Sequence, residues 1–390
     1  MSNILMPGLI DPHVHFREPG LTHKATMTTE AAAAHAGGIA TVCEMPNTIP
    51  PTVTVEALAD KVRRASTITL CDMRFFFGIT DRTHIDELRR LWTDPSLRAL
   101  QQRCSGVKLY LDHSTGNQKI AAELLCDVFA TCAALRVPVV CHCEDPELNA
   151  AATRNHGMRR DAAAHSLRRP PESEAVSIAT AISLTKQHGT QLHIAHLSTA
   201  EGIALVAEAK AMGLPVTCEV APQHLFLTTD DYEHLGALAK INPPLRERTH
   251  QIALWEGIRQ RIVDCIATDH APHTLAEKRT ENPLDAPSGV PGVETMLPLL
   301  LTVASGHWPH PHAPNPGAHL LYEDIARLCF QNPNRIFHLG KEDKTGGNIR
   351  TTVVIDSDAP WTIRGEKLHS LCGWTPYEGW KMHGRVVSWC

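Results

Sequence analysis

Two histidines near the start of the chain have the spacing of metal ligands. His13 and His15 follow the short apolar run 6–10, and residues i and i+2 of an extended strand point to the same side. Both imidazoles can therefore face one metal ion, and Arg17 continues the alternation to a place where it can meet an anion. An isolated His-x-His pair is more often two ordinary histidines at a strand end, so partners elsewhere in the chain decide the interpretation.

Four further chemically capable residues lie in, or near the ends of, other apolar runs. Lys108 lies in the run 106–111, His142 in 137–143, His196 in 191–197 and Asp269 in 264–270. Each alone has an ordinary alternative, such as a hydrogen-bonded core histidine, a salt-bridged lysine or a capping aspartate. Together with the first pair they mark five separate strand ends, and one shared site explains them better than five coincidences.

Nearby polar residues are assigned lesser roles. We expect His193 to be a core histidine and His270 to hydrogen-bond near the metal. Glu219 and His224, on and after the run 215–221, are expected to be structural rather than metal ligands. The stretch 307–312, rich in proline and histidine, is interpreted as a surface loop.

A site of this kind requires a fold that brings several strand ends together. Eight short runs alternate with segments of about 3.6-residue apolar periodicity. This alternation predicts the α/β class and a (β/α)8 TIM-like barrel, whose active site lies at the C-terminal ends of the strands. A doubly wound open sheet is the alternative, but no glycine-rich phosphate fingerprint follows the first strand. The predicted strands are 8–15, 39–45, 73–79, 106–111, 137–143, 191–197, 215–221 and 264–270, and the predicted helices are 26–36, 55–65, 85–92, 120–135, 173–188, 200–212, 250–261, 294–304 and 322–330.

The character of the sequence changes after the last predicted helix. Residues 341–347 are charged and contain glycine, and 351–356 and 385–389 resemble short strands. We therefore expect residues 7–338 to form the barrel, and residues 1–6 and 339–390 to form a small, reduced β appendage.

Composition narrows the class of protein. The 390 residues are 43% hydrophobic and 20% charged with a net charge of −5, so a nucleic-acid partner is not expected. No run approaches the ~18 apolar residues of a membrane span, and the first residues lack the features of a signal peptide. The twelve cysteines lie mostly in apolar runs and include no CxxC pair, which favours a reducing cytoplasm over a disulfide scaffold.

The donor set favours zinc. Imidazole nitrogens and carboxylate oxygens suit Zn²⁺, which bonds them at ~2.0–2.2 Å. Two such cations need more negative charge than Asp269 supplies. Reaction of Lys108 with CO₂ would supply it, because the resulting carbamate is an anion with one oxygen for each metal.

Long motifs spread over residues 7–384 resemble one family. HVHFREPG, MPNT, GVKLYL, VVCHCE, HIAHLS, VTCEVAPQHLFL and IATDHAPH occur in the order seen in dihydroorotases, which are cyclic amidohydrolases of the amidohydrolase superfamily. GVPGVETMLPLLLT and WTPYEG are most similar to the dihydroorotase domain of animal multifunctional pyrimidine-synthesis proteins. The resemblance implies two zinc ions per subunit, one held by His13, His15, Lys108 and Asp269, the other by carboxylated Lys108, His142 and His196.

The resemblance also implies a reaction. It is the reversible cyclisation of N-carbamoyl-L-aspartate to L-dihydroorotate, a step of pyrimidine (UMP) synthesis. A metal-bridging hydroxide attacks the ring amide, and Asp269 acts as general base and then general acid.

The substrate carboxylate needs its own contacts. A guanidinium fork suits a carboxylate, and the resemblance assigns this role to Arg17, with Asn47 and His273 beside it. Asn242 is expected to face the substrate, although an Asn-Pro turn explains it equally well, and backbone groups at Gly292 are expected to contact the ring. Ser114 and Thr115 stand in a lid loop where the animal-type enzymes have a Thr-Phe pair.

Other functions remain as alternatives. A hydantoinase, dihydropyrimidinase or allantoinase acts on neutral rings, which need no carboxylate clamp such as Arg17 and MPNT provide. A scaffold partner of aspartate transcarbamoylase would have lost metal ligands, and His13, His15 and Lys108 are all present. Homodimerisation, and association of an active enzyme with aspartate transcarbamoylase, are left open.

Overall fold

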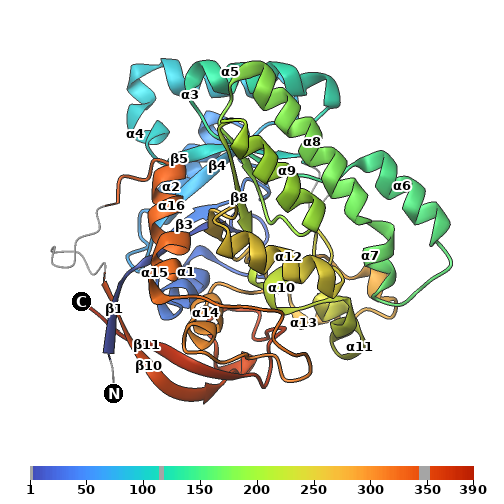
Figure 1. Cartoon of the computed structure of the whole chain (residues 1–390). Helices are drawn as coiled ribbons and strands as arrows, with labels where there is room; N and C mark the ends of the chain where they lie inside the picture. The colour runs from blue at the N-terminus through green and yellow to red at the C-terminus, as the bar shows by residue number, and fades with distance from the viewer. Residues whose placement is uncertain (1–2, 114–117, 342–351) are drawn as a thin grey trace.

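The computed structural model describes residues 3–113, 118–341 and 352–390 (Figure 1). Its main sheet has eight strands in the sequential order β2 to β9, and every neighbouring pair is parallel. A bridge between Val14 and His270 nearly closes this sheet into a barrel. The strands are β2 Leu9–Val14, β3 Ile39–Glu44, β4 Asp72–Gly78, β5 Cys104–Tyr110, β6 Val139–His142, β7 Leu192–Ile194, β8 Val216–Val220 and β9 Cys265–Ile266.

All eight predicted barrel strands are confirmed, but two of them stop well before the predicted ligand at their end. β7 and β9 end two to three residues before His196 and Asp269. Both of those residues have positive φ angles, 33° and 48°, which do not belong to a strand. The chain therefore leaves the sheet early at these ends, and the two side chains lie on turns above the barrel wall.

The predicted helices are also confirmed, and several short ones were not foreseen. The longer helices surround the sheet (Figure 1), and side chains of Thr26, Thr54 and Thr199 cap three of their N-termini. The predicted helices correspond to α1 Met27–Ala36, α2 Val55–Ala65, α3 Arg82–Thr93, α5 Leu125–Leu135, α8 Pro171–His188, α9 Ala200–Ala211, α12 Arg248–Arg259, α14 Met296–Ala304 and α15 Tyr322–Ala326. Those not foreseen are α4 Arg98–Gln101, α6 Pro146–Asn155, α7 Ala164–Arg168, α10 Pro222–Phe226, α11 Tyr232–Leu235, α13 Leu275–Lys278 and α16 Asn332–Ile336.

A small antiparallel sheet joins the two ends of the chain. β10 (Thr352–Thr362) lies between β1 (Asn3–Pro7) and β11 (Lys381–Trp389). β11 packs on α14, where the His383 N–H donates to Thr302 Oγ1 at 2.9 Å. The expected β appendage is thus present, while the proposed division of the chain at residue 338 stays a prediction.

Apolar side chains fill the interior of the barrel at the end opposite its C-terminal mouth. Ile10, Met45 and Phe76 belong to a separate buried cluster, which is completed from the segment after α15 by residues such as Phe337 and Leu339. The Phe337 ring meets Phe76 edge to face, with ring centroids 5.6 Å apart. The polar residues that line the interior of the barrel therefore lie toward its opposite, C-terminal mouth. No helix in the described part of the chain is long and apolar enough to cross a membrane.

Candidate metal centre and substrate pocket

The predicted first ligand group is brought together at the barrel mouth. His15 Nε2 lies 3.0 Å and His13 Nε2 3.3 Å from Asp269 Oδ1, and all three residues are buried. These three residues form one potential metal-binding group. A shift in the β2–β3 register between Asp11 and Val14 accompanies the change from the inward-facing Ile10 to the inward-facing His13.

The ionisation of this group suits a metal. Burial acts to raise the pKa of Asp269, but the neighbouring His13 and His15 hold that pKa well below its usual range. Burial also lowers the pKa of His15 to about 4. At neutral pH the carboxylate is therefore charged and His15 carries a lone pair, which is the form that binds metal.

The predicted second pair of ligands, His142 and His196, faces the same pocket. His142 Nδ1 and His196 Nε2 are 3.0 Å apart, and His142 Nε2 lies 2.8 Å from Glu144. A carboxylate accepts only, so the proton is on Nε2 and the lone pair of Nδ1 points toward His196. Burial lowers the pKa of both histidines, which keeps them neutral. Two imidazole nitrogens at this separation can converge on one cation.

Lys108 is the most unusual member of the site. Its side chain is 1% exposed, and its Nζ has no hydrogen-bond partner among the described residues. The ammonium position lies 5.1 Å from the Tyr110 ring centroid, and burial lowers the pKa of the amine. A buried polar atom without a partner is costly, so the amine fits a site in which it acquires one, as a carbamate does when it binds metal.

Glu219 fixes one metal ligand instead of being one. His13 Nδ1 donates to Glu219, and His193 Nε2 lies 3.1 Å from the same carboxylate. Holding Nδ1 leaves Nε2 of His13 free for a metal. Burial opposes ionisation of Glu219, but the charge and hydrogen bond of His13 keep its pKa well below the usual range. The structural roles expected for Glu219 and His193 are confirmed, and His224 likewise bonds the Pro243 carbonyl at 3.0 Å.

The His270 side chain lies elsewhere than expected. Its Nε2 bonds Glu30 at 2.8 Å, and its Nδ1 accepts the Gly292 N–H at 3.0 Å. Only its backbone carbonyl touches the ligand group, accepting the His15 N–H at 2.7 Å. The tertiary packing of α1 against the barrel decides this, since Glu30 comes from that helix.

The pocket over the ligands contains most of the predicted substrate contacts. Arg17, Asn47 and Asn242 line it together with the histidines and Asp269. Asn47 Oδ1 also accepts from His15 Nδ1 at 2.7 Å. Among the described residues, Ser288 and Gly289 line this pocket and Gly292 does not. The N–H of Gly292 is already used by His270.

The Arg17 guanidinium is oriented by its surroundings. Its Nε donates to the Pro272 carbonyl at 3.0 Å, and its Nη2 lies 3.1 Å from His273 Nε2. Lys24 Nζ lies 3.1 Å from His273 Nδ1. An ammonium only donates, so Nδ1 accepts and the His273 proton is on Nε2, which then donates to the Ser288 carbonyl at 3.0 Å. Both Nη groups of Arg17 therefore have no acceptor among the described residues and can bind a ligand.

Sequence reasoning missed two residues of this site. Tyr110 lines the pocket with a buried hydroxyl that has no partner among the described residues. Glu144 orients His142 and is itself bonded by Arg169. Each lies two positions after a predicted ligand, so the same i, i+2 alternation that paired His13 with His15 could have found them. The predicted lid residues Ser114 and Thr115 lie outside the described residues.

A nearly closed parallel barrel with a buried His-His-Asp group at its C-terminal mouth is consistent with a metal-dependent amidohydrolase. Residues 2–202 match the family model described as dihydro-orotase-like. A dihydroorotase of Halobacterium salinarum is 39% identical over 376 residues, which are 96% of this chain and 82% of that protein. The chain belongs to the dihydroorotase family and is a cyclic amide hydrolase.

Two further proteins are similar to this chain. The multifunctional protein CAD of Squalus acanthias is 32% identical over 98% of this chain, which corresponds to 14% of that much longer protein. The L-hydantoinase (dihydropyrimidinase) of Arthrobacter aurescens superposes with a TM-score of 0.89 at 26% identity, covering 100% of this chain and 84% of that one. The fold is thus shared with enzymes of the alternative class, and the substrate has to be argued from the pocket.

Proposed function

We propose that this protein interconverts N-carbamoyl-L-aspartate and L-dihydroorotate. The observation that carries the proposal is Arg17, a buried cation that lines the same pocket as the metal ligands. A guanidinium with two free Nη groups matches a carboxylate in bidentate geometry. Hydantoin and allantoin carry no carboxylate, and for them this buried charge would lack a partner.

We infer that two zinc ions serve the reaction. His13, His15, Asp269 and carboxylated Lys108 would hold one of them, and His142 and His196 would hold the other with the same Lys108. The facing ring nitrogens of His142 and His196 and the partnerless Nζ of Lys108 support this arrangement. When bound, zinc polarises the ring carbonyl and lowers the pKa of water to about 7.

The residues of the chain then divide the remaining work. Arg17 binds the carboxylate and fixes the ring over the ligand group. Asp269, ionised and 3.0 Å from His15, accepts the proton of the attacking water at its carboxylate oxygen. It returns that proton to the departing ring nitrogen. In the cyclising direction Asp269 takes the proton from the carbamoyl nitrogen instead.

A comparison of substrates tests the reaction. Dihydroorotate, dihydrouracil, hydantoin and allantoin are assayed side by side with zinc-loaded protein. Dihydrouracil is the matched control, because it is dihydroorotate without the carboxylate. We expect turnover of dihydroorotate and at least hundredfold lower kcat/KM for the three neutral rings. Turnover of hydantoin or dihydrouracil without turnover of dihydroorotate would show that the assignment is wrong.

A reconstitution experiment tests the carboxylated lysine. Metal-free protein is supplied with zinc in buffer purged of CO₂ or containing bicarbonate, and bound zinc is counted. We expect two zinc ions per subunit only with bicarbonate, and fewer in Lys108→Met under both conditions. Full occupancy without CO₂, or in the variant, would contradict the inferred bridge.

The remaining proposals concern the cellular location, the catalytic unit, the lid and the assembly of the enzyme. All twelve cysteines are free thiols in the structure, which supports the proposed cytoplasmic location. We also propose that residues 7–338 form the catalytic unit and that Ser114 and Thr115 belong to a lid. Sedimentation with and without aspartate transcarbamoylase would reveal a homodimer or a mixed assembly.

A further inference from the structure

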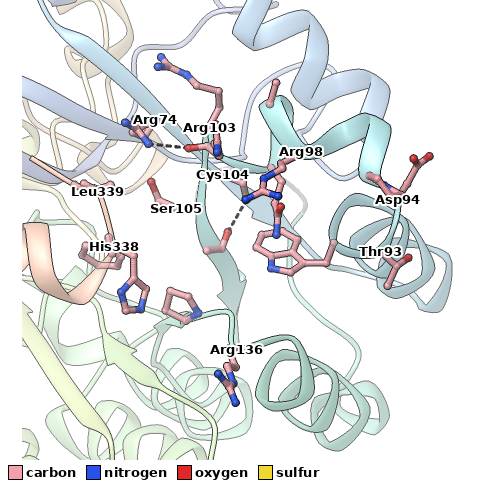
Figure 2. Close-up of a pocket in the computed structure, with 18 residues that line it drawn as sticks. Arg74, Thr93, Asp94, Arg98, Arg103, Cys104, Ser105, Arg136, His338 and Leu339 are labelled. Carbon is pink, nitrogen blue, oxygen red and sulfur yellow. Dashed lines mark hydrogen bonds between the residues drawn. The ribbon is translucent and has the colours of Figure 1, made fainter.

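A large cavity lies at the end of the barrel opposite the metal centre. It measures about 820 Å³ and is built around the first residues of β5, Cys104 to Gly106. Figure 2 shows it, with Arg74, Arg98, Arg103 and Arg136 grouped around the strand. The same strand carries Lys108 and Tyr110 toward the other end of the barrel, so this cavity is separate from the substrate pocket.

The cavity is strongly positive. Among the described residues, four arginines line it against a single carboxylate, Asp94. Beside it Asp72 bonds three cations, with Arg74 and Arg103 at 2.8 Å each and Lys341 at 2.7 Å. One carboxylate does not neutralise three cations, so the described groups at this end of the barrel carry a net positive charge. Such a site attracts anions.

Several donors in the cavity are free to bind a ligand. Arg98 and Arg136 are exposed, and neither side chain makes a hydrogen bond or ion pair with another described residue. Arg103 is held by Asp72, yet its Nε is buried and also has no acceptor in the described part of the chain. A buried donor without a partner calls for an explanation, and an anion in the cavity would provide one.

The rest of the lining is apolar and partly aromatic. Trp92 is half-buried, and Pro138, Phe337 and Leu339 are buried. Gly106 lies close to the Pro138 carbonyl, where a Cβ atom would approach to 2.6 Å. The absence of a side chain at Gly106 lets the strands lie close together there, and an indole face is a suitable surface for a planar ring.

We propose that this cavity binds a nucleoside polyphosphate. The phosphates contact Arg98 and Arg136, and the base packs on Trp92. The volume lies within the roughly 300–1,000 Å³ typical of small-molecule sites, and the excess of arginines matches a multiply charged phosphate chain. The inference does not depend on the reaction proposed for the other end of the barrel.

A binding titration tests the proposal without reference to activity. Zinc-loaded full-length protein is titrated with UTP, inorganic triphosphate and uridine by calorimetry at low salt. We expect one micromolar site for UTP, weaker binding of triphosphate, and a dissociation constant for UTP that rises with salt. No saturable binding of UTP below millimolar concentration would overturn the proposal. Equal affinity for UTP and triphosphate would overturn the role of Trp92.

Paired variants separate this site from general charge effects and from the substrate pocket. In Arg98→Gln/Arg136→Gln we expect the dissociation constant of UTP to rise at least tenfold. The control Arg154→Gln/Arg160→Gln removes the same charge from exposed positions outside the cavity and should change it less than twofold. Equal losses in both variants, or displacement of UTP by dihydroorotate, would contradict the proposed location.

Discussion

Replacing Arg17 with methionine removes the proposed carboxylate clamp while keeping a long side chain at a position with a φ of 67°. The Nε of Arg17 is engaged by the Pro272 carbonyl, which leaves the two Nη groups for substrate. Two hydrogen bonds to a charged acceptor contribute about 1.5–3 kcal/mol each. Their loss should therefore lower kcat/KM for dihydroorotate roughly 10² to 10⁴-fold, because each ~1.4 kcal/mol is a factor of ten.

The assay is steady-state kinetics in both directions, together with zinc analysis of the same preparations. Arg17→Lys is the matched variant, since it keeps the charge but loses the planar fork. We expect its kcat/KM for dihydroorotate to lie between the values of the wild type and of Arg17→Met. Zinc content should be unchanged in both, because the Arg17 side chain donates to Pro272 and lies against His273, neither of which is a proposed ligand. A kcat/KM for dihydroorotate within threefold of wild type in Arg17→Met, with full zinc, would refute this reasoning.

Three further predictions concern residues around the pocket. His142→Ala should lower zinc from two ions to about one per subunit, whereas the buried control His224→Gln should keep both; full zinc in His142→Ala would disprove its role as a ligand. Burial, with the charges of Arg169 and Lys240, lowers the pKa of His165 from its usual 6.5 to about 3. The contribution of the neutral His165 ring to the free energy of unfolding is therefore complete above pH 6.5. It is lost as the pH falls from 6.5 toward 3, because the unfolded state then binds a proton that the folded state does not. His165→Gln should therefore unfold at lower pH than the wild type in an acid titration followed by circular dichroism, and an unchanged midpoint would contradict the shift. Tyr110→Phe removes a pocket hydroxyl that has no partner among the described residues. We expect kcat/KM to fall about tenfold while the melting temperature stays unchanged. A lower melting temperature with normal kinetics would indicate a structural role instead.

Local pattern rules explain why the metal-binding group and the other proposed ligands could be predicted. The side-chain alternation of strands is fixed by backbone geometry, so His13 and His15 could be paired before any fold was known. In a barrel of this kind the active site lies at the C-terminal ends of the strands, so the residues at the other strand ends were expected at the same mouth. The rule did not require the ligands to lie on the strands themselves. His196 and Asp269 lie beyond β7 and β9 on turns with positive φ, which apolar periodicity does not reveal.

Residues oriented by distant partners were harder to predict. His270 was expected near the metal, but its ring bonds Glu30, which is 240 positions away in the sequence. Gly292 was expected to contact substrate, and its N–H is taken by that same His270 ring. Nothing in the local sequence around either residue reports the packing of α1 against the loop after β9. The cationic cavity below the barrel likewise depends on arginines from segments that meet only in the folded chain.

By itself the sequence determined the class of site, because residue type fixes which atoms can bind a metal and strand alternation fixes which of them share a side. It also indicated an acidic substrate, through the place of Arg17 in the decapeptide that contains both histidines. Only the tertiary structure decided which nitrogen of His13, His15 and His142 is free and which Arg17 atoms can reach a ligand. Those properties are set by hydrogen bonds to Glu219, Glu144, Asn47 and Pro272, which come from other strands and loops. Such contacts form when the barrel nearly closes, and no spacing along the chain specifies them.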